Sequence, residues 1–237
     1  MNQSVVDTKL AVEVKELCRV YPSRGSGPDV TALDHINLQI PVGAFVAVKG
    51  KSGSGKTTLL NCLGGLDQPT SGEILVHGQS IAQMSAAQLT EWRQKEAGFI
   101  FQAFGLLPTL SAYENVELML RIAGMPRSER RGRANEVLEM VGLGKWANQR
   151  PFEMSGGQQQ RVAIARAFAP RPNLILADEA TGELDTQTSH EILELMRNLV
   201  KEQGITIVLV THDNLVDKYV DEILQLADGK LTSGSAG

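Results

Sequence analysis

Short apolar segments rich in β-branched residues recur along the chain, and helical patterns lie between several of them. Residues 205–210 are almost continuously apolar, which is typical of a parallel strand covered on both faces. After the last of these segments, Asp228-Gly229 favours a hairpin. We expect strands at residues 10–17, 36–40, 45–48, 74–76, 99–101, 174–177, 205–210 and 223–226.

The helical patterns carry recognisable start and stop signals. Ser111 and Glu114 have the spacing of a capping box, and Gly124 ends the segment that follows. Residues 128–141 predict another helix, closed by Gly142. Between residues 186 and 202 an apolar stripe recurs at helical spacing, which we interpret as core packing. The stripe consists of Ile192, Leu195, Met196 and Leu199.

Strands with interleaved helices occupy both ends of the chain, whereas residues 103–168 are mostly helical. Alternating strands and helices predict a parallel sheet. The simplest interpretation of 237 residues is therefore one α/β domain, residues 1–237, whose core carries an inserted helical subdomain at about residues 103–168.

Composition narrows the choice of function. The formal net charge is −4, which does not favour wholesale nucleic-acid binding. No run of eighteen apolar residues is present, and the first nine residues lack the apolar stretch of a secretory signal. We expect a fraying tail at residues 232–237, and a buried, inert thiol at Cys62. These features fit a cytoplasmic protein.

A glycine-rich segment, GKSGSGKT at residues 50–57, separates the predicted strand at 45–48 from a helical pattern. It fits G-x-x-x-x-G-K-[ST], in which backbone N–H groups face one anion at a helix N-terminus. Lys56 would reach the β- and γ-phosphates, and Thr57 would hold Mg²⁺. A Gly/Ser-rich turn is the plainer alternative. The expected nucleotide-binding residues are Gly50, Ser52, Gly53, Ser54, Gly55, Lys56, Thr57 and Thr58.

Two carboxylates, Asp178 and Glu179, follow the apolar segment 174–177. Ligands of a parallel sheet gather at the carboxyl ends of its strands, where the glycine-rich segment also begins. Asp178 would then complete the Mg²⁺ shell, and Glu179 would orient a water in line with the γ-phosphate. Without the glycine-rich segment, such a pair is usually a solvated turn.

A second glycine-containing segment starts at Ser155. Ser155 and Gln158 have capping-box spacing ahead of a helix at residues 159–168. Gly156 and Gly157 would expose further N–H groups at the same helix start, which makes a second anion site. Two phosphate sites in one chain predict that each serves a different nucleotide.

These motifs, in this order, resemble the ABC ATPase family over residues 10–231, with the segment MSGGQ at residues 154–158 resembling the family signature. The resemblance implies a RecA-like P-loop NTPase core with a parallel sheet, an N-terminal antiparallel β subdomain and an inserted helical subdomain. It also implies ATP and Mg²⁺ as ligands, and ATP hydrolysis as the activity.

Further residues take their expected roles from the same resemblance. Tyr21 would stack on adenine, although an aromatic side chain ahead of Pro22 could merely pack. Gln102 would touch Mg²⁺ and sense the γ-phosphate. Asp185 would communicate across a dimer, and His212 would act as the switch histidine. The implied catalytic residues are Glu179, His212, Lys56 and Gln102; the implied metal ligands are Thr57, Gln102 and Asp178.

The segments at residues 101–116, 158–167 and 176–182 resemble the LolD, MacB and FtsE subgroup. Four positions depart from the family pattern: Lys51, Met154, Ala180 and Glu183. The resemblance implies a head-to-tail dimer of two copies, with each ATP between the loop at residues 50–58 of one chain and residues 155–158 of the other. It further implies an integral membrane permease partner, no nucleic acid, and a peripheral location at the cytoplasmic face of the inner membrane.

Three alternatives remain open from the residues. A soluble ABC ATPase acting on nucleic acid or the ribosome would normally need two cassettes or a long coiled coil. A regulatory module would bind ATP with little turnover, which the carboxylates and His212 argue against. A P-loop kinase would leave residues 155–158 unexplained. The sequence does not reveal the cargo or the direction of transport.

Overall fold

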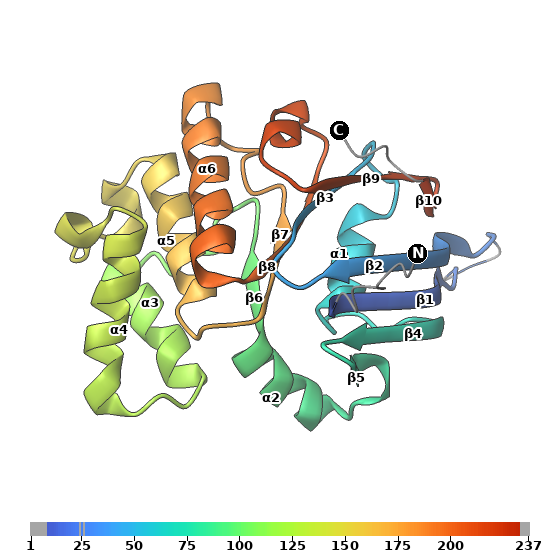
Figure 1. Ribbon diagram of the computed structural model, residues 1–237, viewed down its shortest axis with the longest axis horizontal. Helices are drawn as coiled ribbons and strands as arrows, with labels where there is room; N and C mark the ends of the chain where they lie inside the picture. The colour runs from blue at the N-terminus through green and yellow to red at the C-terminus, as the bar shows by residue number, and fades with distance from the viewer. Residues whose placement is uncertain (1–8, 24, 26, 233–237) are drawn as a thin grey trace, which may run out of the picture.

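The computed structural model describes residues 9–23, 25 and 27–232. The expectations for the N-terminal segment before residue 9 and for the tail after residue 232 lie outside this range. Two sheets and a group of helices make up the described chain (Figure 1).

The larger sheet has six strands in the order β10-β9-β3-β8-β7-β6. Strands β9, β3, β8, β7 and β6 run parallel, which confirms the predicted parallel sheet, and β10 pairs with β9 in the antiparallel sense. Asp228 and Gly229, between β9 and β10, have φ of 48° and 73°, as a tight hairpin turn requires. The strands are β3 (Phe45–Lys49), β6 (Ala97–Ile100), β7 (Leu174–Asp178), β8 (Thr206–Thr211), β9 (Glu222–Ala227) and β10 (Lys230–Thr232).

The smaller sheet is antiparallel, with the order β2-β1-β4-β5. It confirms the antiparallel β subdomain that the family resemblance implied. Its strands are β1 (Leu10–Tyr21), β2 (Val30–Pro41), β4 (Ser71–Val76) and β5 (Gln79–Ser80). The first strand therefore runs four residues beyond its predicted end at residue 17, as far as Tyr21.

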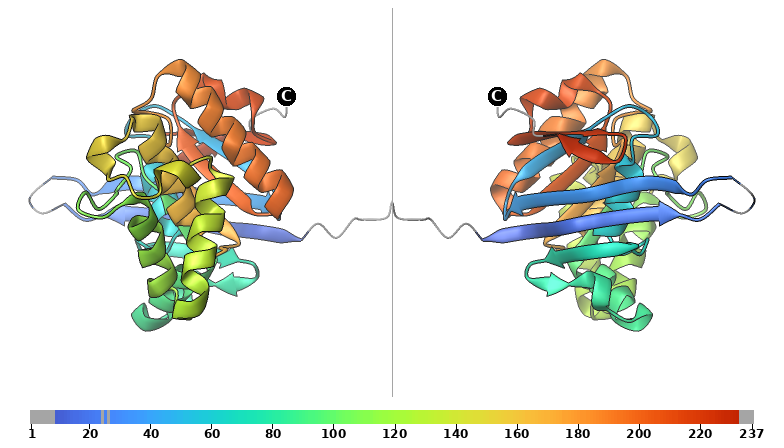
Figure 2. Two further views of the ribbon diagram at one scale, coloured as in Figure 1. Left: turned by 90° about the vertical axis from the view of Figure 1, so that its left-hand side faces the viewer. Right: turned by 90° about the vertical axis from the view of Figure 1, so that its right-hand side faces the viewer.

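Helices cover both faces of the larger sheet. The α-helices are α1 (Lys56–Leu63), α2 (Ala86–Glu96), α3 (Ala112–Ile122), α4 (Arg127–Met140), α5 (Gly156–Phe168) and α6 (Thr186–Gln203). The short 3₁₀ helices are η1 (Ile81–Gln83), η2 (Gly144–Trp146), η3 (Pro151–Glu153) and η4 (Asn214–Lys218). Figure 2 shows α3, α4 and α5 gathered at one end, opposite the antiparallel strands.

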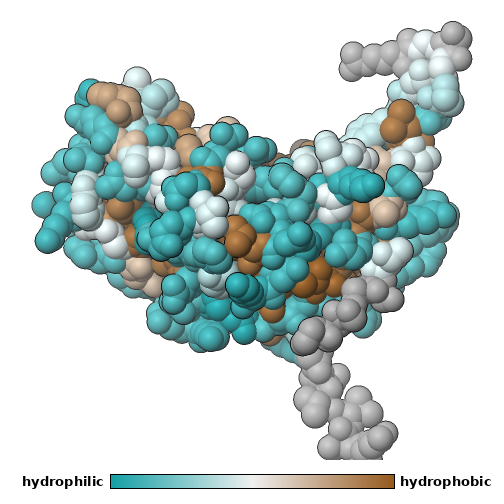
Figure 3. All heavy atoms as spheres, turned by 90° about the horizontal axis from the view of Figure 1, so that it is seen from above, coloured by the Kyte–Doolittle hydropathy of each residue, from teal (hydrophilic) through white to brown (hydrophobic). Residues whose placement is uncertain are grey.

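Two hydrophobic cores lie on opposite faces of the six-stranded sheet. In β8, Ile207 and Leu209 belong to the core shared with α3–α6, whereas Val208 and Val210 belong to the core shared with α1 and the smaller sheet. Alternate side chains of a strand point to opposite faces, so burial on both faces requires the continuous apolar run seen in the sequence. On the outside, the face seen from above Figure 1 is mostly hydrophilic, with apolar residues in small patches (Figure 3).

One α-helix was not predicted, and neither were the four short 3₁₀ helices. Helix α2 buries only Leu89 and Trp92, so its apolar stripe is too thin to stand out from its polar residues. The signal that marks it is the capping box of Ser85 and Gln88. Cys62 is buried as expected, and burial raises the pKa of its thiol to about 12, which makes it inert.

Candidate functional site

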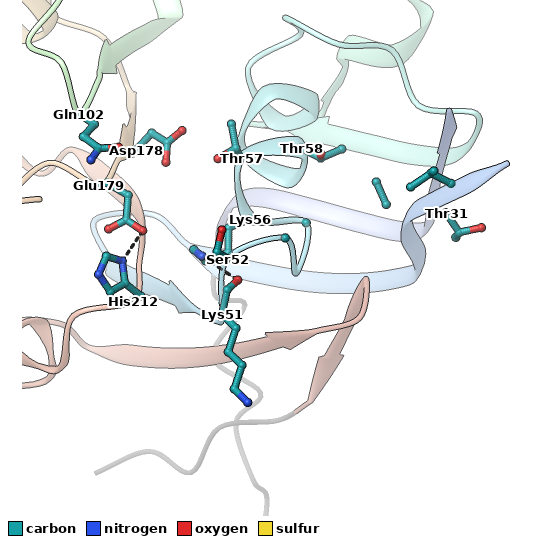
Figure 4. A pocket seen from close by; sticks show the side chains of 14 residues that line it. Thr31, Lys51, Ser52, Lys56, Thr57, Thr58, Gln102, Asp178, Glu179 and His212 are labelled. Atoms are coloured by element: carbon teal, nitrogen blue, oxygen red, sulfur yellow. Dashed lines mark hydrogen bonds and ion pairs between the residues drawn. The ribbon is translucent and has the colours of Figure 1, made fainter. Parts of the chain in front are cut away.

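The glycine-rich loop connects the end of β3 to the start of α1, at the carboxyl edge of the parallel strands. His212 follows β8, the strand next to β3, and Asp178 ends β7 on the other side of β8. Because parallel strands end at the same edge, three distant sequence segments meet there (Figure 4). Together they line a cavity of about 720 Å³. The predicted residues that line it are Ser52, Gly53, Gly55, Lys56, Thr57, Thr58, Gln102, Asp178, Glu179 and His212.

Close packing explains why the loop needs its glycines. A Cβ on Gly50 would lie 2.2 Å from the carbonyl oxygen of Leu226, so a side chain there would push the loop away from β9. Gly55 has a φ of 104°, a conformation that other residues rarely adopt. It is the N-cap residue of α1 and supplies no side-chain cap. The N–H groups at the start of α1 are therefore available to an anion.

The polar groups of the loop fit a bound phosphate chain. The Lys56 ammonium donates to the carbonyl oxygens of Gly50 at 2.8 Å and Lys51 at 3.2 Å, so the cation is held inside the loop. The Ser54 hydroxyl is buried with no hydrogen-bond partner among the described residues. A buried cation and an unsatisfied hydroxyl, together with a helix N-terminus, provide the environment that a phosphate needs.

Glu179 is held at both carboxylate oxygens. Thr211 donates its hydroxyl to Oε2 at 3.0 Å, and Nδ1 of His212 lies 2.9 Å from Oε1. The Glu179 side chain is 14% exposed, and its φ is 47°. A non-glycine residue in this backbone region is costly and often marks a functional site. The carboxylate is therefore fixed at the edge of the cavity, where it can orient a water molecule.

The oxygen donors of the predicted metal site lie on one side of the cavity. Thr57, Gln102 and Asp178 all line it, and hard oxygen ligands suit Mg²⁺. Burial raises the pKa of Asp178; the nearby Glu179 raises it further, whereas Thr57 and Lys56 act in the opposite direction. A cation beside Asp178 would relieve the cost of this buried charge, so the residues fit the metal.

The second predicted anion site lies elsewhere in the chain. Ser155 caps α5: its hydroxyl accepts the N–H of Gln158 at 3.3 Å, and the Gln158 side chain accepts the N–H of Ser155 at 2.9 Å. The predicted capping box is thus confirmed. Within the part of the chain that the structure describes, none of residues 155–158 lines the cavity at the glycine-rich loop. The two anion sites of one chain therefore cannot serve one phosphate group.

Asp185 and Tyr21 have structural partners of their own. Asp185 caps α6, accepting the N–H of Thr188 at 3.0 Å and its hydroxyl at 2.6 Å. Tyr21 donates its hydroxyl to Asp67 at 2.5 Å, and the Arg19 guanidinium lies 4.2 Å from its ring centroid. Tyr21 is not among the residues that line the cavity. The roles of both residues toward nucleotide stay predictions.

The sequence did not single out Thr211, whose place at the end of the apolar strand β8, directly before His212, was the available signal. It also missed Val30, Thr31 and Ala32, which line the cavity from β2. They come from the smaller sheet, and no motif links that sheet to the glycine-rich loop.

Comparisons with known proteins agree with the geometry. A family model described as "ABC transporter" matches residues 33–182. The chain is 43% identical over 226 residues to the lipoprotein-releasing system ATP-binding protein LolD of Chromohalobacter salexigens, covering 95% of this chain and 94% of LolD. It is 44% identical over 225 residues to the macrolide export ATP-binding/permease protein MacB of Hyphomonas neptunium, covering 94% of this chain but 34% of MacB.

A solved structure also resembles the chain throughout. The dimeric structure of a post-hydrolysis state of the ATP-binding cassette MJ0796 bound to ADP and Pi has a TM-score of 0.86 and 43% sequence identity. The match covers 95% of this chain and 98% of that one.

Proposed function

This chain belongs to the ABC transporter family as an ATP-hydrolysing, ATP-binding subunit, and from that premise we propose how its residues act. The observation that carries the proposal is the Glu179 carboxylate, held by Thr211 and His212 at the edge of the cavity beside the glycine-rich loop. Two copies close head to tail around two ATP molecules, and opening and closing of the dimer drives a membrane subunit.

Each ATP lies between two chains. The glycine-rich loop of one chain binds its phosphates, and Ser155, Gly156, Gly157 and Gln158 of the other chain present the N-terminus of α5 to the γ-phosphate. The separation of these two sites within one chain supports this arrangement, as does the dimeric state of the similar cassette MJ0796. Asp185 lies next to the same surface. It caps α6 at Thr188, and α6 approaches Gly157 so closely that a Cβ on Gly157 would lie 2.5 Å from Thr188.

Hydrolysis depends on positioning and charge. Glu179 orients the attacking water and accepts its proton, and His212 and Thr211 keep the carboxylate in place. Lys56 and the loop N–H groups stabilise the charge that develops on the phosphate oxygens. Thr57, Asp178 and Gln102 would hold Mg²⁺, which supplies further charge neutralisation when bound.

A separate apolar groove supports a membrane permease as partner. Leu66, Phe99, Phe101, Met119 and Ile122 line it, between α2 and the root of the helical lobe. Phe101 precedes Gln102, so a segment seated in the groove would touch the loop that carries a cavity residue. A helix of a permease would fit there, and we propose that this subunit lies at the cytoplasmic face of the membrane.

No helix within the described residues has the length and apolar character to cross a bilayer. MacB is named for both an ATP-binding and a permease part, and this chain covers 34% of it. The region at about residues 103–168, with α3, α4 and α5, would carry motion from the dimer to the permease partner.

The substitution Glu179→Gln tests the proposal. The amide keeps the shape of the side chain but cannot accept the proton, so the variant should bind ATP and accumulate as a closed dimer. Size-exclusion chromatography with light scattering, with and without ATP and Mg²⁺, measures this, and a phosphate-release assay measures turnover. Glu194→Gln, an exposed position on α6, is the matched control and should hydrolyse ATP at the wild-type rate.

A Glu179→Gln variant that hydrolyses ATP at the wild-type rate would contradict the role of Glu179. Wild-type chain that binds ATP but shows no turnover, even with its membrane partner, would favour a regulatory module instead.

A further inference from the structure

Lys49 is a buried cation that the proposed hydrolysis mechanism does not use. It is the last residue of β3, directly before the glycine-rich loop, and its side chain is 9% exposed. Its ammonium donates to Oδ1 of Asn214 at 2.6 Å, and to Oδ1 and Oδ2 of Asp217 at 2.8 and 3.1 Å. All the acceptors found for it among the described residues belong to η4.

Helix η4 begins two residues after His212. Asp213, between them, caps η4 by accepting the N–H of Leu215 at 2.9 Å, and its own N–H donates to the Thr211 hydroxyl at 3.1 Å. On the other side, Thr211 pairs with Lys49 in the parallel ladder of β8 and β3. His212 thus sits in a short connection with a strand at one end and η4 at the other.

The two ends are held differently. Backbone hydrogen bonds of the sheet fix the strand end. The η4 end is held by Val216, which is buried in the core, and by the Lys49 side chain. The lysine contact is strong because a buried ammonium that loses its partners is strongly unfavourable. If η4 moved away, the ammonium would lose all three contacts at once. Since His212 lies 2.9 Å from Glu179, any shift of this connection would change how the carboxylate is held.

We propose that Lys49 is a positioning residue for ATP hydrolysis: through Asn214 and Asp217 it anchors η4, and thereby holds His212 against Glu179. The inference rests on the proposed function of Glu179. The same lysine immediately precedes Gly50, so one residue ties the base of the phosphate-binding loop to the segment that carries the switch histidine. A positioning role of this kind affects turnover more than ATP binding.

The test is Lys49→Met, which keeps the length of the side chain and removes its charge. We expect kcat for ATP to fall about tenfold, with KM changed by less than about twofold, because a misplaced catalytic group costs rate rather than affinity. Lys49→Arg, which keeps the charge, should recover part of the loss. The control is Lys218→Met, an exposed lysine on the same short helix, which should leave kcat unchanged.

Asp217→Ala provides an independent variant, because its side chain is 41% exposed, whereas that of Lys49 is 9% exposed. We expect its removal to disturb the fold less than a change at the buried lysine. If the two residues act through one contact, Lys49→Met/Asp217→Ala should lose no more activity than the worse single variant. Additive losses would overturn the proposal, and so would a Lys49→Met variant with wild-type kcat. If circular dichroism shows that Lys49→Met does not fold, the test passes to Asp217→Ala. A wild-type kcat in that variant would equally overturn the proposal.

The failure of this inference can be told from failure of the proposed function. With Glu179→Gln added to Lys49→Met, ATP should still trap a dimer, because closure does not need the His212 contact. Suppose that the wild-type chain hydrolyses ATP and that Glu179→Gln traps a dimer, but that Lys49→Met keeps the wild-type kcat. In that case the proposed function stands, and only the role of Lys49 is contradicted.

Discussion

Glu183 Oε1 accepts a hydrogen bond from Nε2 of Gln102, with a donor–acceptor distance of 3.3 Å. Because the amide nitrogen faces Glu183, the amide oxygen is free to face the cavity, where Figure 4 shows Gln102 beside Asp178. An oxygen is the atom that a magnesium ligand must offer. This contact gives a physical account of Glu183, one of the four positions at which the chain departs from its family pattern.

Glu183→Ala should therefore weaken magnesium binding without touching the ATP phosphates. We expect the Mg²⁺ concentration for half-maximal ATPase activity to rise by up to about tenfold, the range found when a partner that orients a metal ligand is removed. The measurement is a Mg²⁺ titration at saturating ATP. Glu194→Ala is the control, and an unchanged midpoint in Glu183→Ala would show that the hydrogen bond does not orient Gln102.

Thr211→Val should reduce turnover while preserving shape. The change removes the hydroxyl that donates to Glu179 at 3.0 Å and that accepts the N–H of Asp213. A hydrogen bond to a charged group contributes about 1.5–3 kcal/mol, so kcat should fall at least about tenfold. Steady-state kinetics measures this fall in kcat. Thr90→Val, on the exposed side of α2, is the control variant. Equal kcat values for the two variants would remove Thr211 from the mechanism.

Ser155 can be tested against an almost identical cap in the same chain. Ser85 and Gln88 cap α2 with the same capping box that Ser155 and Gln158 form on α5. Ser155→Ala and Ser85→Ala should each lower stability by about 1 kcal/mol, seen as similar falls in Tm. In a Glu179→Gln background, only Ser155→Ala should weaken ATP-dependent dimerisation. Equal dimerisation of both variants would mean that Ser155 is only a helix cap.

The pH dependence of stability should report the buried charge of Asp178. Its pKa is raised, first by burial, so the folded chain binds that proton more tightly than the unfolded chain does. Stability then falls as pH rises from about 3.9, the ordinary aspartate value, through the raised pKa. Above that window the ionised group destabilises the fold at every pH.

Asp178→Asn should consequently melt at a higher temperature than wild type near neutral pH, in the absence of nucleotide and metal. The difference should shrink as the pH falls toward about 4, where the wild-type carboxyl is protonated too. Thermal melts at several pH values measure this. If the variant melts lower at neutral pH, burial does not dominate the environment of Asp178. Its ATPase activity should be lost in any case.

Sequence reasoning located most of the cavity because its residues lie in short segments that must be contiguous. The glycine-rich loop needs its glycines at fixed spacing, and Glu179 must directly follow a strand. The larger sheet was equally accessible, since strands buried on both faces are continuously apolar, as in β8. Helix α2 escaped because only two of its side chains are buried.

Contacts between segments far apart in sequence were beyond such reasoning. Lys49 and Asp217 are 168 residues apart, and Gln102 and Glu183 are 81 apart. Neither pair has a spacing rule, because the order of strands in the sheet decides which loops meet. The contact of the Tyr21 hydroxyl with Asp67 was equally beyond the sequence, and the role of Tyr21 toward adenine stays a prediction.

The sequence by itself thus determined the family, the glycine-rich loop and the capped helix start at Ser155, which are the two predicted anion sites. All three depend on local backbone requirements, such as a positive φ at Gly55 or a cap at Ser155, which neighbouring residues specify. The tertiary structure alone decided what holds Glu179 in place and where the Lys49 ammonium is buried. Those outcomes depend on which strands become neighbours, and that is fixed by the packing of the two cores.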